Sequence, residues 1–317
     1  MIALPANTAM DRLVRIGHSP DPDDAFMFYA LTAGKVRIPG VRIEHVLEDI
    51  ETLNRRSREA ELEVTAVSFA TYLLIADRYR MMDPGASMGK GYGPILVARQ
   101  PIPRQELESR VTAIAGKHTT SALLLRLYVG DPPLIEVAFD KIPAAVLEGQ
   151  ADLGLLIHEG QITYGKMGLT KVLDLGEAWQ QDTGLPLPLG CNVMRRDLGD
   201  DLHRSLSQAL KDSIAWAHAH VDEALEYAMR YGRGIDKETC RRFVLMYVND
   251  FTLALGRDGR AAIERLFTMA RDKGLVPIVP PIDPICSATR AACADQRVSR
   301  GPARGPVGAI EGASRPA

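Results

Sequence analysis

The sequence predicts an α/β fold of two lobes, with a ligand cleft between the lobes and a helical C-terminal part that wraps around them. Strand and helix patterns alternate from Leu13 onward, and a second, shorter α/β run follows a proline-rich connection. From Asp200 to about Lys273 the apolar residues recur at three- and four-residue spacing, which is typical of helices. Because alternating strands and helices form mostly parallel sheets covered by helices on both faces, each run predicts one lobe.

The first run consists of three strands, each followed by a helix. Apolar residues alternate or run together in the strands, and Gly34 ends the first helix, where glycine readily takes the left-handed conformation. The expected elements are strands at 13–19, 41–48 and 64–69 and helices at 23–34, 49–61 and 70–79.

The chain is expected to leave the first lobe through a glycine-rich turn and the connection at 100–106, "QPIPRQE". The second run ends at the apolar strand "DLGLLIHE", and the stretch "TGLPLPLGCNVMRR" is expected to bring the chain back to the first lobe, as a pocket wall, a hinge or a plain crossover. We therefore predict a discontinuous larger domain (13–99 and 192–284), a smaller domain (100–191) and a disordered tail (285–317), which is poor in large apolar residues.

The composition narrows the class of partner. The chain has 317 residues and a formal net charge of -2, and its lysines and arginines are scattered, whereas a nucleic-acid or anionic-membrane partner favours a basic face. The four cysteines form no CxxC pair and no zinc spacing, which favours reduced thiols. The first residues lack the pattern of a secretion signal. We therefore expect a cytoplasmic protein with a small-molecule ligand and neither metal nor cofactor.

In a two-lobed α/β architecture the ligand lies near the carboxyl ends of strands and the N-termini of helices. A dinucleotide-binding fold is the alternative, but it needs GxGxxG between the first strand and the first helix. The turn at that place reads "GHSPDPDD", which does not fit.

The stretch "AGKHTTSALLL" is a candidate anion site. A buried strand ends at Gly116, and Thr119, Thr120 and Ser121 begin a helix, so free N–H groups, hydroxyls and the positive end of the helix dipole gather at one place. His118 in the same loop could add positive charge. The alternative is an ordinary threonine cap, which needs only one hydroxyl.

His158 is the candidate general base. It follows a strand so apolar that it must be buried, and it therefore emerges at the strand's carboxyl end, which faces the cleft. An imidazole there can titrate near neutral pH. The alternative is a histidine that only packs or caps.

Three aspartates stand in "SPDPDD", between the first strand and the first helix. Asp21, Asp23 and Asp24 could gather a divalent ion, but no other cluster at ligand spacing supports one. Acidic residues at a helix start are favourable against its dipole, which accounts for one or two of them and not for all three.

Several stretches together resemble one family. The motifs "HSPDPDDAFMFYAL", "EDIETLNR", "GKHTTSALLL", "LLIHEGQITYGKMGL", "TGLPLPLG" and "YVNDFTLALG" occur in the order found in 1,4-dihydroxy-6-naphthoate synthases, the menaquinone-biosynthesis enzymes of the futalosine route. The resemblance covers roughly residues 15–276, and it is the combination of motifs that is specific.

The resemblance implies a periplasmic-binding-protein-like (type II) fold and a lyase-type reaction that converts cyclic dehypoxanthinyl futalosine to 1,4-dihydroxy-6-naphthoate without metal or nucleotide. His158 matches the base that begins ring opening and loss of the sugar-derived part. Together with the positions discussed above, the expected substrate-binding residues are Ser19, Asp24, Ser68, Thr119, Thr120, Ser121 and His118.

The opening stretch departs from the family pattern, which is closer to "SPCPNDTF". Asp21 stands in place of a cysteine, Asp23 in place of an asparagine and Ala25 in place of a threonine, whereas Asp24 is shared. We expect Asp24 to cap the helix at the pocket rim, and Asp21 and Asp23 to change the ligand preference toward a polyol and away from an anion.

Two alternatives to this enzyme stay open at the level of sequence. A small-anion solute-binding or sensing protein could use the same fold without chemistry. A related enzyme such as chorismate dehydratase shares the fold, although "TGLPLPLG" and the "IHE" motif favour the synthase.

Overall fold

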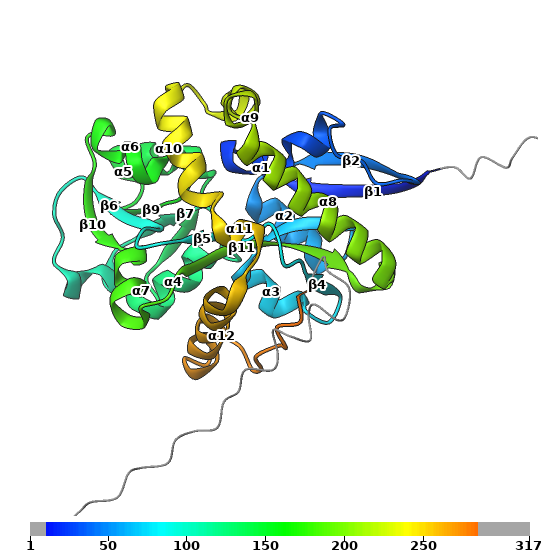
Figure 1. Ribbon diagram of the computed structural model, residues 1–317. Coiled ribbons are helices and arrows are strands. Elements are labelled where there is room, and N and C mark those ends of the chain that lie inside the picture. The colour runs from blue at the N-terminus through cyan, green and yellow to red at the C-terminus, as the bar shows by residue number, and fades with distance from the viewer. Residues whose placement is uncertain (1–10, 285–317) are drawn as a thin grey trace, which may run out of the picture. The chain divides into compact units, whose positions relative to one another are not determined.

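The computed structural model describes residues 11–284, which form two β-sheets surrounded by helices (Figure 1). The tail predicted to be disordered, 285–317, lies outside the described residues.

The first sheet has the strand order β2-β1-β3-β11-β4, and β5 also pairs with β11. β1 runs parallel to both of its neighbours, β2 and β3, while β11 runs antiparallel to β3 and joins the end of the smaller lobe to the larger one. The strands are β1 (Arg12–His18), β2 (Val41–Leu47), β3 (Val64–Ser68), β4 (Tyr79–Met81), β5 (Ser87–Gly89) and β11 (Leu187–Arg195).

The second sheet has the order β10-β6-β9-β7-β8. Its strands are β6 (Ile95–Ala98), β7 (Thr112–Ile114), β8 (Leu134–Glu136), β9 (Leu153–Leu156) and β10 (Thr170–Asp174). β7 is parallel to β8 and β9, as the α/β pattern predicts, but β6 is antiparallel to both of its neighbours. β6 precedes the proline-rich connection and is therefore expected from the sequence to belong to the larger domain. In the structure β6 pairs within the second sheet. The domain boundaries drawn from the sequence stay a prediction.

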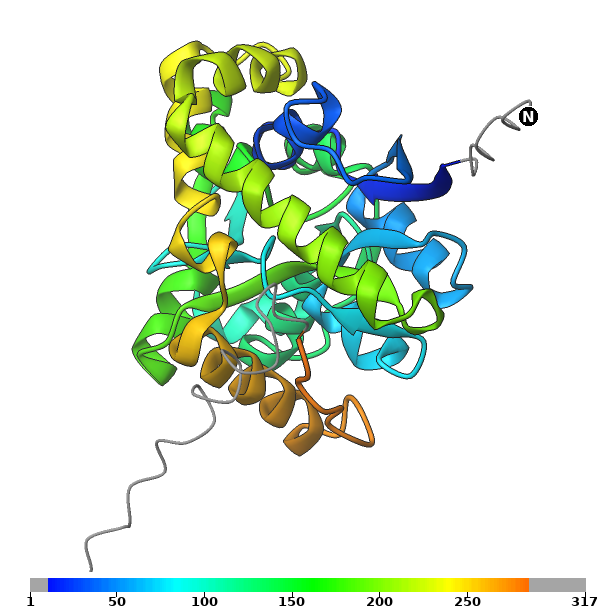
Figure 2. The ribbon, with the colours of Figure 1, turned by 45° about the vertical axis from the view of Figure 1, so that its right-hand side comes forward.

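Helices cover both sheets, and the C-terminal helices lie over the first sheet and beside the second (Figures 1 and 2). The helices of the first 199 residues are α1 (Pro22–Thr32), α2 (Ile50–Arg58), α3 (Phe69–Ile75), α4 (Thr120–Tyr128), α5 (Ile142–Leu147), α6 (Gly160–Thr163) and α7 (Leu175–Thr183). The C-terminal helices are α8 (Asp200–Ala219), α9 (Val221–Ala228), α10 (Lys237–Tyr247), α11 (Asp250–Leu253) and α12 (Gly256–Asp272).

The start of the first lobe follows its sequence pattern closely. α1 ends near Gly34, whose φ of +66° is the left-handed conformation expected there. The helix is buried between β1 and the long helix α8, and Ser213 Oγ of α8 donates to the Met27 carbonyl at 2.7 Å. Phe26 and Phe28 are among the largest fully buried side chains. This packing fixes α1, and with it the loop that begins the helix.

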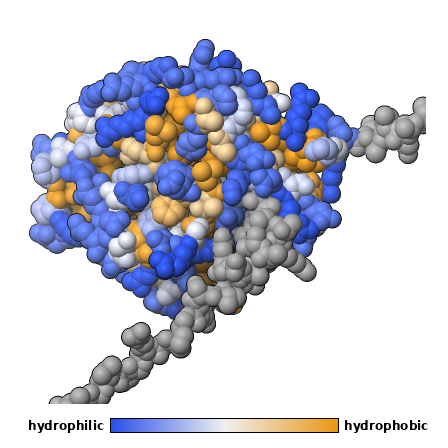
Figure 3. All heavy atoms as spheres, viewed as in Figure 1, coloured by the Kyte–Doolittle hydropathy of each residue, from blue (hydrophilic) through white to orange (hydrophobic). Residues whose placement is uncertain are grey.

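The surface in Figure 3 mixes hydrophobic and hydrophilic residues rather than showing one broad apolar face. Within residues 11–284, no helix is long and apolar enough to cross a membrane. Cys191 and Cys240, the two cysteines in that range, are buried and free.

Candidate active site

A pocket lies where strands from both sheets end. Ser19 follows β1, Ser68 ends β3, and His158 follows β9. Because parallel strands present their carboxyl ends at one edge of a sheet, the two sheets bring these short segments to a common cavity. The polar residues and cysteine that line it are Ser19, Asp21, Asp23, Asp24, Ser68, Ser87, Thr119, Thr120, Ser121, His158, Gln161, Cys191, Asn192 and Tyr247.

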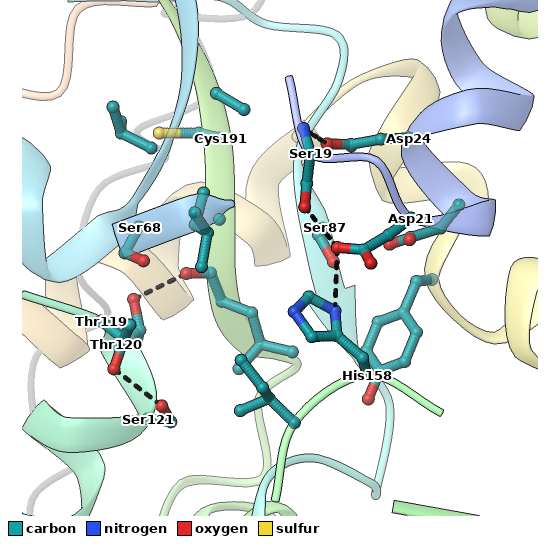
Figure 4. Close-up of a pocket in the computed structure, with 18 of the residues that line it drawn as sticks. Ser19, Asp21, Asp24, Ser68, Ser87, Thr119, Thr120, Ser121, His158 and Cys191 are labelled. Atoms are coloured by element: carbon teal, nitrogen blue, oxygen red, sulfur yellow. Dashed lines mark hydrogen bonds and ion pairs between the residues drawn. The ribbon is translucent and has the colours of Figure 1, made fainter. Parts of the chain in front are cut away.

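Apart from His118, the predicted residues lie on two opposite walls of the pocket (Figure 4). The hydroxyls of Ser68, Thr119, Thr120 and Ser121 lie on one wall, and His158 lies across the cavity with the aspartates that begin α1. The stretch "TGLPLPLG" runs into β11, whose residues from Leu189 to Asn192 complete the lining, so that it serves as a pocket wall.

The start of α4 binds its own backbone more than the sequence suggested. Thr119 is the N-cap, and its Oγ1 accepts from the Ala122 N–H at 3.2 Å and donates to the Gly116 carbonyl at 2.8 Å. Thr120 Oγ1 donates to the Leu189 carbonyl at 2.6 Å. Both hydroxyls therefore donate within the protein, and because Thr119 and Thr120 also line the pocket, their contact with a ligand stays a prediction.

Donors for a ligand remain on the same wall. No hydrogen bond among the described residues uses the backbone N–H groups of Thr120 and Ser121, which are orphan donors of the first turn of α4. Ser68 Oγ accepts from Asn54 Nδ2 at 3.1 Å, so its own hydrogen stays available. The anion-binding capacity of this wall therefore resides in backbone N–H groups and in Ser68.

His118 does not line the pocket. Its Nδ1 lies 2.6 Å from Glu51 Oε1, and its Nε2 lies 3.2 Å from Arg58 Nη1. Glu51 is buried in α2 of the larger lobe and also accepts from the His118 N–H at 3.1 Å. The structure thus gives His118 a link between α2 and the α4 loop, in place of the expected contact with substrate.

Asp24 lines the pocket as expected, but it does not cap α1. The N-cap is Asp21, whose side chain makes no cap hydrogen bond. Asp24 lies three residues further on, and its Oδ2 accepts from the Ser19 N–H at 2.7 Å. The Asp24 carboxyl group therefore stabilises the loop after β1 and not the N-terminus of α1.

Asp21 is the aspartate that meets His158. Its side chain is 1% exposed, and its Oδ2 lies 3.3 Å from His158 Nδ1. Its Oδ1 accepts from Arg233 Nη2 at 2.5 Å, and Ser19 Oγ donates to the carboxylate as well. In Figure 4 the Nδ1 edge of the imidazole faces Asp21, and the other ring nitrogen faces the cavity.

The three aspartates differ in their electrostatics. Burial opposes ionisation of Asp21, but the charges of His158 and Arg233 outweigh it and lower the pKa of Asp21. Burial, together with the charge of Asp21, raises the pKa of Asp23 to about 6. Burial and the charge of Asp23 likewise raise the pKa of Asp24 well above its usual value. The pocket thus holds one stable carboxylate beside the imidazole and two carboxyl groups that resist ionisation.

These carboxyl groups do not form a metal site in the described part of the chain, where no three His, Cys, Asp or Glu side chains gather as ligands. Asp23 Oδ1 is buried and has no hydrogen-bond partner among residues 11–284. An available acceptor of that kind suits a hydroxyl-bearing ligand.

Sequence reasoning missed Arg233, Gln161 and Tyr247 as parts of the site. The Tyr247 hydroxyl and the Gln161 side-chain amide share a hydrogen bond of 2.5 Å. Arg233 reaches Asp21 from the loop between α9 and α10. The one local signal for Arg233 is its place between two glycines in "YGRGID", which is too general to indicate a contact with residues more than 200 positions away.

The family model for menaquinone biosynthesis matches residues 14–272. A curated relative from Thermus thermophilus, named 1,4-dihydroxy-6-naphtoate synthase, is 44% identical over 267 residues, which are 84% of this chain and 97% of the relative. A relative of the same name from Streptomyces coelicolor is 35% identical over 275 residues, 84% of this chain and 96% of its own.

Solved structures resemble the chain as well. A crystal structure of a protein from Archaeoglobus fulgidus is 50% identical, with a TM-score of 0.81 over 83% of this chain and 98% of its own. The periplasmic aliphatic sulphonate-binding protein SsuA from Escherichia coli superposes with a TM-score of 0.60 at 11% identity, over 96% of this chain and 98% of that protein. The second likeness concerns the fold alone, and it confirms the predicted periplasmic-binding-protein-like class.

Proposed function

Since the chain belongs to the menaquinone biosynthesis family, we propose that it is a 1,4-dihydroxy-6-naphthoate synthase, a lyase-type enzyme that acts on cyclic dehypoxanthinyl futalosine in the cytoplasm. The similarity to two curated synthases over 84% of the chain supports this reaction. The pocket also combines polar side chains on two walls with apolar lining from both lobes, as small-molecule sites usually do.

The observation that carries the chemistry is the position of His158. Its imidazole is held at Nδ1 by a carboxylate, and the opposite nitrogen faces the cavity. In this proposal that nitrogen removes the proton that starts ring opening, as a general base does in many enzymes. The sugar-derived part is then lost from the naphthoate nucleus.

The two walls of the pocket divide the ligand between them. The carboxylate of the naphthoate nucleus accepts hydrogen bonds from the N–H groups of Thr120 and Ser121 and from the hydroxyl of Ser68. These groups are the donors on this wall that have no acceptor among residues 11–284. Asp23 and Asp24 accept hydrogen bonds from hydroxyl groups of the sugar-derived part.

Incubation of the purified protein with cyclic dehypoxanthinyl futalosine, followed by mass spectrometry, tests the reaction. The proposal predicts that 1,4-dihydroxy-6-naphthoate accumulates over many turnovers. Binding of the substrate without product, measured by calorimetry on the same protein, would instead indicate a solute-binding protein. Dehydration of chorismate by the protein would indicate the related enzyme.

A further inference from the structure

Asp21 connects two charged partners that come from distant parts of the chain. It lies after β1 of the first sheet, and His158 lies after β9 of the second, so the 3.3 Å contact between them crosses the cleft. Arg233 reaches the same carboxylate from the loop before α10 and also donates to the Pro20 carbonyl at 3.1 Å. Three separate segments thus meet at one buried carboxylate.

We propose that Asp21, held by Arg233, is a positioning residue that keeps His158 in the tautomer with hydrogen on Nδ1 and the free lone pair on the nitrogen facing the cavity. A carboxylate next to one ring nitrogen favours the N–H form at that nitrogen, and the other nitrogen is then the one able to accept a proton. The same carboxylate stabilises the imidazolium that forms once the proton has been taken.

The backbone around the imidazole supports a positioning role. His158 has a φ of 56° and Arg233 a φ of 48°, both in the left-handed region that residues other than glycine seldom occupy. Such conformations are unfavourable and persist only where surrounding contacts impose them. Both residues are held by Asp21, so the bridge fixes where the imidazole sits.

Aromatic packing restricts the ring further. The Phe139 ring lies edge-on to the His158 imidazole, with centroids 4.8 Å apart, and the Arg233 guanidinium lies 4.4 Å from the Phe139 centroid. Phe139 therefore contacts both the imidazole and the guanidinium. The imidazole has little freedom to turn its other edge toward the carboxylate.

The charged groups around His158 come from several elements. Asp21 and Asp23 belong to the start of α1, Glu159 follows His158 in the chain, and Arg233 approaches from the α10 side. Arg233 Nη1 also lies 3.2 Å from Glu159 Oε1, so the guanidinium balances two carboxylates. Removal of Asp21 and removal of Arg233 therefore change the potential at the imidazole in opposite directions.

The test compares Asp21→Asn, Arg233→Gln and the control Asp222→Asn. Asp222 is 83% exposed and pairs with Lys237 and Arg241 at the surface, so its variant repeats the chemical change outside the pocket. We measure kcat and KM from pH 5 to 9 with cyclic dehypoxanthinyl futalosine. Nitrogen-15 NMR of histidine-labelled protein without ligand reports the tautomer of His158, with His158→Ala assigning its signals.

We expect Asp21→Asn to lower kcat about 100-fold or more, with a much smaller change in KM, because the imidazole then presents the wrong tautomer for most of the time. In Asp21→Asn, the acidic limb of the pH profile of kcat/KM moves to lower pH. Arg233→Gln moves that limb to higher pH, since an unbalanced carboxylate favours imidazolium. NMR shows hydrogen on Nδ1 in the wild type and a mixture of tautomers in Asp21→Asn. Asp222→Asn behaves as the wild type.

The inference rests on the proposed function, and the two can fail separately. If His158→Ala retains full turnover, the proposed base is wrong and Asp21 positions no base. If His158→Ala is inactive while Asp21→Asn keeps the wild-type kcat and pH profile, only the positioning role is overturned. If Asp21→Asn does not fold, Arg233→Gln still tests the proposal. An acidic limb of the kcat/KM profile that moves to lower pH, or does not move, in Arg233→Gln contradicts it.

Discussion

Asp23→Asn should raise the free energy of unfolding at pH 8 and leave it almost unchanged at pH 4. Asp23 lies near the start of α1 beside Asp21, and its Oδ1 is buried without a hydrogen-bond partner in the described chain. Burial and the neighbouring charge raise its pKa from 3.8 to about 6. Ionisation of this carboxyl group is therefore harder in the folded protein than in the unfolded chain.

The direction of the effect follows from proton linkage. Between pH 3.8 and about 6 the folded state binds more protons at Asp23 than the unfolded state does, so stability falls as the pH rises through this window. Above pH 6 the full destabilisation by the ionised Asp23 is present, and below pH 3.8 it is absent. A tenfold change in proton affinity corresponds to about 1.4 kcal/mol, which sets a ceiling of about 3 kcal/mol. Because the carboxyl group borders an open pocket, we expect about 1–2 kcal/mol.

Urea unfolding of the wild type and Asp23→Asn at both pH values measures the difference, and Asp222→Asn is the exposed control. The reasoning requires a gain for Asp23→Asn at pH 8 that disappears at pH 4, with no gain for Asp222→Asn at either pH. Equal stability at pH 8, or a loss that is greatest at pH 8, would refute it.

Two further substitutions probe the walls of the site. Glu51→Gln should lower the free energy of unfolding by about 2–4 kcal/mol, because the buried carboxylate contacts both His118 Nδ1 and the His118 N–H. Thermal unfolding measures this change, and an unchanged midpoint temperature would contradict the link between α2 and the α4 loop. Ser68→Ala should weaken substrate binding about 5- to 30-fold, since a hydrogen-bond donor worth about 1–2 kcal/mol is lost from the pocket wall. Calorimetry measures the dissociation constant, and a wild-type value would show that Ser68 does not contact the ligand.

Features set by local sequence could be predicted. The apolar run before His158 places this residue at a strand end, and the Thr119 hydroxyl accepts the cap hydrogen bond that a threonine before a helix usually accepts. Gly34 ends α1 through its left-handed backbone. In each case the physical cause lies within a few residues, so the pattern contains it.

Features set by tertiary contacts could not be predicted. Asp21 and Arg233 are separated by 212 positions, and no periodicity links them. The Thr120 hydroxyl donates to the Leu189 carbonyl, which belongs to a strand that returns from far along the chain. His118 pairs with Glu51 from another lobe, so a histidine that suits an anion loop by its position serves a structural link instead.

The measurement that tests the central claim most directly is the turnover and the binding of cyclic dehypoxanthinyl futalosine by His158→Ala. The account predicts that kcat falls by about 10²–10⁴, the usual contribution of a general base, while the dissociation constant changes little because the opposite wall is intact. Wild-type turnover by His158→Ala would contradict the account.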